Sequence, residues 1–331
     1  MRARSAVLLI GMCLCASVAR AGQLSILEEN DSLFFTSDKH YTQGIRGAYL
    51  SDPLASDDWR YKTFDLVPVL FPDAAASERR FDWIFLGQSI FTPINLTLNP
   101  PDPHDRPYAG WLYTGGSLLQ ENGNQLTGLE LLLGVVGTAA LGRQVQNDWH
   151  QFIVGIPGGE GWHDQLKNEP ALVLSYERRW RVGVADFGDV GIDIVPEAGV
   201  TAGNVFTYGA VGGVMRFGQD LAADYGPARI RPAPSGTDWF DGSRLTKPLG
   251  WYVFAGAEGR AVARNVFLDG NAFASSPHVA KKPLVGDLTA GVALFWKNDL
   301  RLDIGLLTRT KEFYGQQGED SYAGFRFSFG L

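Results

Sequence analysis

The feature that most constrains the fold of this chain is a period of two in its side chains, repeated from one end to the other. In the stretches 251–262 and 300–308, apolar residues alternate with small or polar residues, which is typical of β-strands with one oily face. Charged residues stand at alternate positions inside both stretches, as Glu258 and Arg260 do in the first. A hydrated lumen accommodates such charges better than a dry core does. The pattern therefore predicts an all-β protein, an antiparallel transmembrane β-barrel whose oily face meets lipid.

Twelve segments of the chain carry this strand pattern. An even number is expected of a bacterial single-chain barrel, in which both termini reach the same side. The tripeptides Asn122-Gly123-Asn124 and Lys297-Asn298-Asp299 are typical of tight hairpin turns between neighbouring strands. The expected strands are 23–34, 41–51, 82–92, 108–121, 125–137, 170–182, 189–201, 205–217, 249–263, 284–296, 300–312 and 321–331.

The end of the chain supports a membrane barrel. In 322–329, aromatic residues alternate with small or polar ones, and the segment resembles the terminal strand signal of outer-membrane proteins. We expect the aromatic side chains to face lipid and the residues between them to face the lumen. The last residue is Leu331 where that signal has Phe. A buried terminal strand of a soluble protein is the alternative.

Residues 1–21 have the features of a secretory signal peptide. A basic start precedes an apolar stretch that is too short to cross a bilayer as a helix, and Ala19-Arg20-Ala21 fits a cleavage site. We therefore expect a leader over 1–21 and an outer-membrane β-barrel over 22–331. Both cysteines of the chain lie in the leader, so we expect neither a disulfide nor a cysteine metal site in the mature protein.

Charge and hydropathy narrow the class of protein further. The formal net charge is −7, and the leader removes three arginines, so the mature chain is more acidic still. An acidic chain of this kind argues against nucleic acid as a partner. No later window holds 18 consecutive apolar residues, so no helical membrane span is expected. We expect a monomer surrounded by outer-membrane lipids.

The order of the strands assigns the connections to two sides of the membrane. With the N-terminus in the periplasm, the connections alternate between periplasm and exterior. Two of the expected periplasmic connections, 52–81 and 218–248, are long for that side. The expected exterior connections are 34–40, 93–107, 138–169, 202–204, 264–283 and 313–320.

The first connection draws attention to chemistry. Between two expected strands, where a barrel needs only a short turn, the segment 29–44 gathers Asn, Asp, Ser and Thr residues. A second candidate lies in the 138–169 loop, where apolar residues recur at helical spacing and predict a short amphipathic helix. Gln146 and His150 are four residues apart and therefore neighbours on one face of that helix. A surface helix with an incidental histidine is the alternative, and the shared side of the barrel favours a site.

Three motifs in order resemble the lipid A 3′-O-deacylases of Gram-negative outer membranes, the LpxR type. They are Glu29–Ser32 followed by Asp38–Gly44, then Asp105–Trp111, and then Gln146-Asn147 with His150. The resemblance covers the first half of the mature chain, and the second half agrees in barrel character. It implies a twelve-stranded barrel and a calcium-dependent esterase that removes the 3′-acyloxyacyl chain of lipid A. Its active site would lie at the outer rim, between the barrel wall and a helix of an extracellular loop.

The resemblance also assigns roles to residues. The family's catalytic histidine matches His150, its glutamine one turn earlier matches Gln146, and its Asn-Asp pair matches Asn30 and Asp31. Neutral imidazole suits a general base. A Ca²⁺ held by Asp31 and neighbouring oxygens would polarise the ester, and Asn30 would donate to the oxyanion. Thr42, or Ser32 in its place, is expected to meet substrate through its hydroxyl. Arg106-Pro107-Tyr108 is typical of a strand entry pinned by a salt bridge, and Arg106 is also a candidate to bind a lipid A phosphate.

Other residues and functions stay open at this point. His40 is a candidate for a supporting role, whereas His104, His163 and His278 stand in polar loops and are expected to be solvated. An outer-membrane phospholipase would need a serine beside the histidine, and no Gly-x-Ser-x-Gly motif is present. A passive porin or structural barrel is the alternative outside the enzymes.

Overall fold

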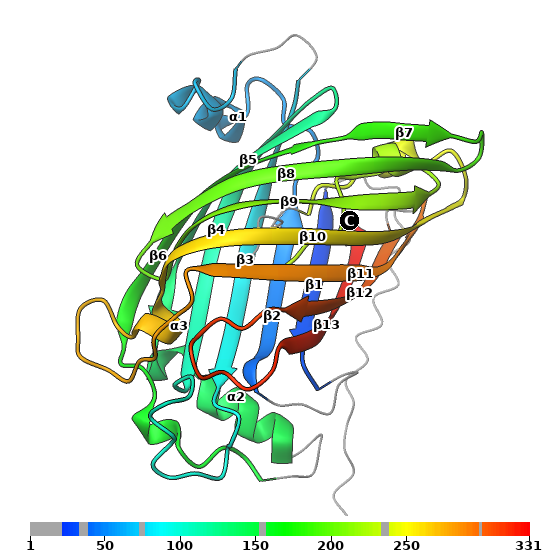
Figure 1. The fold of residues 1–331 in the computed structure, drawn as a ribbon. Helices are drawn as coiled ribbons and strands as arrows, with labels where there is room; N and C mark the ends of the chain where they lie inside the picture. The colour runs from blue at the N-terminus through cyan, green and yellow to red at the C-terminus, as the bar shows by residue number, and fades with distance from the viewer. Residues whose placement is uncertain (1–21, 33–38, 73–76, 152–156, 233–237, 298–299) are drawn as a thin grey trace, which may run out of the picture.

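The computed structural model describes residues 22–32, 39–72, 77–151, 157–232, 238–297 and 300–331. Their strands form one antiparallel sheet that closes into a barrel (Figure 1). The strands are β1 Gln23–Asn30, β2 His40–Leu50, β3 Glu78–Thr92, β4 Ala109–Asn122, β5 Gln125–Val136, β6 Glu169–Trp180, β7 Val182–Asp186, β8 Gly191–Gly203, β9 Phe206–Gly218, β10 Leu249–Asn265, β11 Leu284–Trp296, β12 Leu300–Arg309 and β13 Asp320–Gly330.

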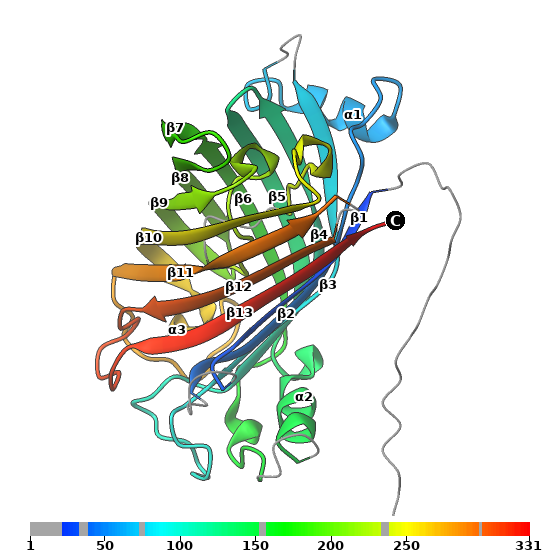
Figure 2. The ribbon, with the colours of Figure 1, turned by 90° about the vertical axis from the view of Figure 1, so that its right-hand side faces the viewer.

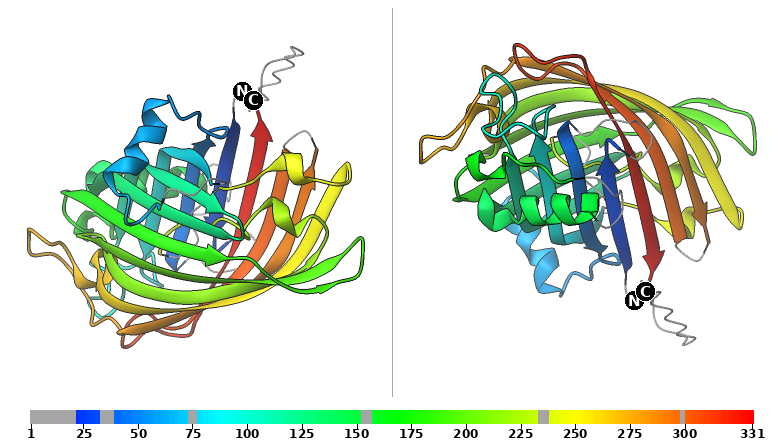
Figure 3. Two further views of the ribbon diagram at one scale, coloured as in Figure 1. Left: turned by 90° about the horizontal axis from the view of Figure 1, so that it is seen from above. Right: turned by 90° about the horizontal axis from the view of Figure 1, so that it is seen from below.

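The barrel has twelve strands when β6 and β7 are counted as one, as the sequence predicted. Only Arg181 separates β6 from β7. Both pair with successive parts of β8, so together they occupy one strand position in the wall. β1 pairs with β13, with Gln23 opposite Gly330, which brings the two ends of the described chain together (Figure 3). We call this the terminal end of the barrel and the opposite end the loop end. The hairpin turn at Gly123 has a φ of 62°, the left-handed conformation that favours glycine.

The alternation of side chains follows the sequence pattern. Glu258 and Arg260 point into the lumen and pair with each other, while Phe327 and Phe329 of the last strand are exposed on the outer wall. One expectation was wrong. Tyr322 points inward, because it lies an odd number of positions before Phe327 and Phe329, which are exposed on the outer wall. Strand side chains alternate with a period of two, so Tyr322 cannot share their face. Its phenol accepts a hydrogen bond from Arg309 at 3.0 Å in the lumen.

The loop end carries the long connections that the sequence grouped together. They include 93–108 between β3 and β4, 137–168 between β5 and β6, and 310–319 between β12 and β13. Helix α2 (Gly142–Trp149) lies in the second of these, where an amphipathic helix was predicted, and α3 (Val266–Asp269) follows β10. The remaining expected helix residues 152 and 153 fall outside the described residues. Among the residues described, no helix is long and apolar enough to cross a membrane.

The two long connections at the terminal end have different destinations. The first, residues 51–77, contains α1 (Trp59–Thr63) and packs against the outside of the wall, where Tyr61 lies 4.3 Å beneath the guanidinium of Arg79. We call it the strap. The second, residues 219–248, turns back into the barrel (Figure 3), and we call it the lumen segment. Their length therefore reflects packing on and inside the barrel.

Ion pairs fasten the lumen segment to the inner wall. Asp238 pairs with Arg46 of β2 at 3.2 Å and with Arg326 of β13 at 3.0 Å. Arg231 pairs with Glu130 of β5, and Arg229 pairs with Asp287 of β11 at 2.8 Å. Buried charges of both signs satisfy each other there, which is the arrangement that burial of charge requires. Charged residues at inward strand positions, read from the sequence as lumen residues, thus hold a segment of the same chain.

Candidate active site

Helix α2 packs on the outer face of the wall at the loop end (Figure 2). The backbones approach closely at Gly110 of β4 and Gly142 of the helix, since a Cβ added to Gly110 would lie 3.2 Å from the Gly142 nitrogen. Gln88 of β3 points outward and donates to the Ala140 carbonyl at 2.7 Å. The glycine of the Asp105–Trp111 motif therefore serves a close contact between wall and helix.

An aromatic platform supports the helix from the wall. Trp162 and Tyr108 are fully buried with ring centroids 4.7 Å apart, and they form a cluster with Ile90 and with Val145 of the helix. The indole nitrogen of Trp162 donates to the Gln146 side-chain oxygen at 2.9 Å. Gln146 is thereby fixed between the helix and the platform. Its observed contact is to Trp162, a partner that the sequence spacing did not identify.

His150 ends the helix and is 3% exposed, so it is not an incidental surface histidine. Its Nδ1 lies 3.2 Å from the carbonyl oxygen of Pro157. A carbonyl can only accept, so Nδ1 carries the hydrogen and Nε2 carries the lone pair in the neutral ring. Asn147 reinforces the arrangement, because its side-chain oxygen accepts a hydrogen bond from the Gly159 nitrogen at 3.1 Å. The imidazole is thus held in the tautomer that a general base at Nε2 requires.

The first motif lies at the same end of the barrel as α2 (Figures 1 and 2). Asn30 is the last residue of β1 and is buried, and its side-chain oxygen accepts from the nitrogen and the hydroxyl of Ser32 at 2.8 and 2.7 Å. Both lone pairs of that oxygen are used, so the amide NH₂ is the group that Asn30 offers to other partners. Asp31 accepts from the Lys39 nitrogen at 2.7 Å. The two residues are therefore held by a local turn.

Thr42 belongs to the same corner of the rim. Its hydroxyl lies 2.6 Å from the hydroxyl of Thr92 at the end of β3, and its carbonyl accepts from the Asp31 nitrogen at 3.3 Å. The register of β2 shifts beside it, between Tyr41 and Gln43. Such irregularities re-aim side chains at barrel rims. Thr42 is buried, so its expected contact with substrate stays a prediction.

The sequence reasoning missed a carboxylate on the outer wall. Glu28 stands two residues before Asn30 on β1, so the two side chains share the outward face. Gln43 of β2 donates to Glu28 at 3.0 Å. Exposing a carboxylate to lipid costs free energy. The pair of Glu28 and Gln43 therefore indicates that this part of the wall contacts polar groups as well as lipid. The signal was present as the period-two spacing of Glu28 and Asn30.

Arg106 is pinned by a salt bridge just before β4, as the sequence indicated. It is fully buried, pairs with Glu312 at 2.6 Å and lies 5.3 Å above the Phe91 ring. Burial by itself would raise the pKa of Glu312, but the guanidinium groups of Arg106 and Arg309 outweigh it and hold that pKa below its usual value. This burial argues against direct contact between Arg106 and a lipid A phosphate. The salt bridge instead fastens the 93–108 loop to the 310–319 loop.

His40 continues this connection around the rim, and we call the five residues His40, Asp105, Arg106, Glu312 and Asp320 the rim clasp. The ring nitrogens of His40 lie 2.7 Å from Asp320 and 3.2 Å from Asp105. Burial alone would raise the pKa of Asp105, but the hydrogen bonds from His40 and the Ile94 nitrogen outweigh it, and the pKa is lowered. With both nitrogens engaged by carboxylates, His40 has a structural role. His104 and His163 are exposed, as predicted.

The residues around Asn30 and Asp31 are the candidates to hold the expected Ca²⁺. Within the described ranges, no three His, Cys, Asp or Glu side chains lie close enough to hold a metal ion. Asp31 supplies a carboxylate, and its surroundings supply hydroxyl and main-chain oxygens. Such oxygens, completed by water or substrate, are the ligands that Ca²⁺ takes, whereas nitrogen- and sulfur-seeking metals find no set there. The chemistry of these donors suits calcium, and a Ca²⁺ site at Asp31 stays a prediction.

Comparisons with known proteins give the chain a family. The family model described as outer membrane protein LpxR matches residues 5–331. LpxR from Salmonella typhimurium is a similar solved structure, with 23% identity, a TM-score of 0.72, and coverage of 93% of this chain and 99% of that one. The β domain of the Bordetella autotransporter BrkA is less similar, with 11% identity, a TM-score of 0.43, and coverage of 95% and 99%. No curated protein sequence matches significantly. The chain belongs to the LpxR family of outer membrane proteins.

Proposed function

We propose that this protein is a lipid A deacylase that hydrolyses the ester at the 3′-oxygen of lipid A and releases the acyloxyacyl chain. Membership of the LpxR family supports this function. The observation that carries it is His150, a buried imidazole with an oriented Nε2 lone pair, on a helix packed against the lipid-facing side of the wall. An acylated lipid can reach such a site from within the membrane.

His150 acts as the general base in this proposal. Its Nε2 accepts a proton from a water molecule, and the water oxygen attacks the ester carbonyl carbon. The tetrahedral intermediate then collapses, the bond from the acyl carbon to the 3′-oxygen breaks, and the proton on Nε2 passes to that oxygen. The products are the acyloxyacyl chain as a free carboxylic acid and lipid A with a free 3′-hydroxyl. The hydrogen bond from Nδ1 to Pro157 keeps the ring in one tautomer through the cycle.

Asn30 is assigned to the oxyanion. Because its side-chain oxygen is held by Ser32, its amide hydrogens are the groups that can donate to the developing negative charge. When bound by Asp31 and neighbouring oxygens, Ca²⁺ supplies Lewis acidity for the ester carbonyl. Gln146 positions the helix through Trp162 and places His150 one turn away on the same face. Thr42 is proposed to meet substrate at the rim.

The site lies at the loop end, opposite the chain termini. Barrels of this class carry short turns on the periplasmic side and longer loops outside. We therefore propose that the site faces the outer leaflet and that the protein works as a monomer.

The test is mass spectrometry of lipid A from Gram-negative membranes with and without the expressed protein. We expect lipid A to lose one acyloxyacyl unit from the 3′-position. A chelator should abolish this deacylation, and added Ca²⁺ should restore it. Unchanged lipid A in membranes that contain folded barrel would refute the function. Full activity in excess chelator would refute the role of Ca²⁺ and leave the deacylase function standing. Phosphatidylethanolamine in the same membranes distinguishes the phospholipase alternative, which would release fatty acid from it instead.

A further inference from the structure

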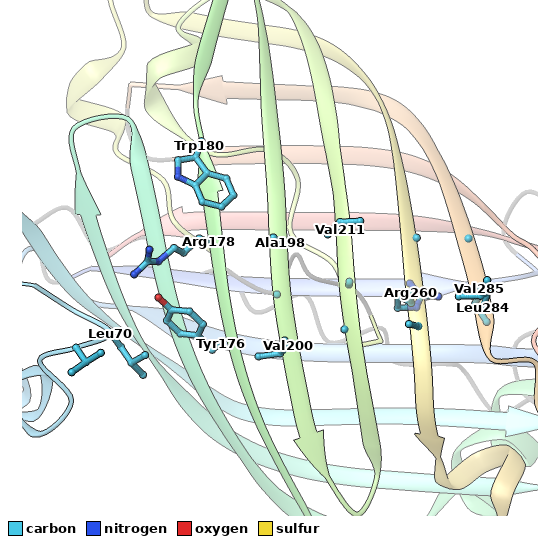
Figure 4. Close-up of a pocket in the computed structure, with 17 residues that line it drawn as sticks. Leu70, Tyr176, Arg178, Trp180, Ala198, Val200, Val211, Arg260, Leu284 and Val285 are labelled. Carbon is cyan, nitrogen blue, oxygen red and sulfur yellow. The ribbon is translucent and has the colours of Figure 1, made fainter.

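A second lipid-accessible feature lies on another part of the wall. A groove of about 1130 Å³ crosses the outer face of β6, β8, β9, β10 and β11 (Figure 4). None of the residues lining it belongs to the site around His150. It therefore needs an explanation separate from the deacylase.

Small residues make the floor of the groove. Gly209 of β9 and Gly259 of β10 face outward, and a Cβ added to either would meet no atom within 4 Å. Ala198 of β8 and Ala261 of β10 continue the floor. Other outward positions of β9 and β10 carry large side chains, such as Met215 and Val253, which are about half exposed. The absence of side-chain volume at the two glycines is what hollows the wall.

An arginine stands at one end of this floor. Arg178 projects from the outer face of β6 between Tyr176 and Trp180, and its guanidinium carbon lies 5.6 Å from the centre of the Tyr176 ring (Figure 4). Its Nε is buried and finds no hydrogen-bond acceptor among the residues that the structure describes. An outward arginine without an anion is costly on a lipid-facing wall. A ligand with a negatively charged group would therefore provide the partner that the guanidinium of Arg178 needs.

The register places Arg178 near the terminal end. It pairs with Thr127 of β5, three residues after Asn124 in the turn that joins β4 and β5. Aromatic residues and arginines in this position sit at the level of the lipid headgroups, where phosphate is the available anion. The floor of the groove then extends from the headgroup level along the wall, in the region of the acyl chains.

The strap extends this surface. Its residues Val69 and Leu70 line the groove together with β6. Three of its apolar side chains are unusually exposed, Trp59 at 71%, Leu66 at 80% and Val69 at 88%. An apolar patch that is continuous with a lipid-facing wall is an interfacial membrane contact.

We propose that the groove is a binding site for one phospholipid, whose phosphate pairs with Arg178 and whose acyl chains lie over Gly209 and Gly259. The site is distinct from the proposed active site and does not depend on the deacylase activity. With the terminal end in the periplasm, the ligand is a phospholipid of the periplasmic leaflet.

Native mass spectrometry of the detergent-purified full chain, titrated with palmitoyl-oleoyl phosphatidylglycerol, tests this site. We expect one lipid to remain bound to the wild-type protein at concentrations at which further lipids dissociate. Arg178→Gln should weaken its retention at least about tenfold, since a charge-assisted hydrogen bond is removed. Gly209→Leu should weaken it by filling the groove, and it leaves the charge intact. Gly183→Leu is the matched control, because Gly183 of β7 also has open space around it and lies outside the groove.

The outcomes separate the possibilities. Equal retention by wild type, Arg178→Gln and Gly209→Leu would overturn the site. Stronger retention of purified lipid A than of phosphatidylglycerol, lost in the same two variants, would overturn the assignment to phospholipid. Circular dichroism and heat-modifiable migration on gels confirm that each variant is folded. Lipid A deacylation is expected to be unchanged in all three variants, so failure of the deacylase and failure of this site are distinguishable.

Discussion

At the scale of single residues, His150 carries the sharpest prediction. Its replacement by alanine should lower lipid A deacylation at least ~10²-fold, the low end for lost general-base catalysis. His163→Ala is the control, because that side chain lies in the same loop but is about half exposed and pairs with Asp164. Mass spectrometry of lipid A gives the rates. Near-normal activity of His150→Ala, or equal loss in both variants through failed insertion, would contradict the assignment.

Asn30 offers a second test with a close match elsewhere in the chain. Asn95 also accepts hydrogen bonds from the nitrogen and hydroxyl of a residue two positions on, Thr97, but it is exposed. Asn30→Ala should reduce the rate about 10²–10³-fold if the amide stabilises the oxyanion. Asn95→Ala removes the same type of turn and should leave the rate unchanged. Similar modest losses in both variants would show that Asn30 acts through the turn alone.

At the scale of elements, the contact between α2 and the wall decides where His150 lies. Gly110→Val would place side-chain atoms where the Ala140 side chain and the Gly142 backbone now stand, 3.1 and 3.2 Å from the first added carbon. The helix should be displaced and deacylation should fall at least about tenfold, because small displacements of catalytic groups are costly. Gly183→Val, in open space, is the control. Full activity of Gly110→Val would mean that the close packing is dispensable.

The rim clasp should control the stability of the loops at the same end. Glu312→Gln leaves the charge of Arg106 buried without its carboxylate and should destabilise this region by roughly 3–5 kcal/mol. Hydrogen exchange should show lost protection in 93–108 and 310–319. Asp189→Asn, which breaks an exposed pair with Lys247, should change exchange little. Unaltered protection in Glu312→Gln would show that the loops are held by other contacts.

The same clasp predicts a dependence on acid. The pKa values of Asp105 and Glu312 are lowered in the folded protein, so their contribution is complete above their ordinary values near 4 and is lost as the pH falls through the lowered values. Protection of the two loops should therefore decrease below about pH 4. In Glu312→Gln the decrease should be smaller.

At the scale of the whole molecule, the lumen segment sets the permeability of the barrel. Its ion pairs tie it to β2 and β13 through Asp238 and to β5 through Arg231, so we expect no steady conductance in planar bilayers. Replacing 226–240 by a short Gly-Ser linker should open a conducting path and weaken the barrel. Wild-type channels of stable conductance would favour the porin alternative instead.

Some parts of the site were readable in the sequence and others were not. The Gln146–His150 spacing places two side chains on one helical face because a helix has 3.6 residues per turn, and this relation is local. The tautomer of His150 depends on Pro157, and the burial of Arg106 depends on Glu312, which is distant in the chain. The sequence indicated a salt bridge at Arg106 but could not identify its partner for that reason, and phosphate binding by Arg106 stays a prediction. Glu28 was overlooked although its spacing to Asn30 was visible, because a single glutamate in a strand does not reveal which face meets lipid.

The sequence by itself determined the class of fold. Alternation with a period of two, twelve strand segments and tight turns leave a closed barrel as the arrangement that satisfies every backbone group in lipid. Tertiary structure alone decided where the two long connections go, since the sequence shows only that 52–81 and 218–248 are long. One folds against the outer wall and the other fills the lumen, because burial of charge inside the barrel requires partners of opposite sign from distant strands. Such pairings are properties of the closed barrel and are not encoded in any local pattern.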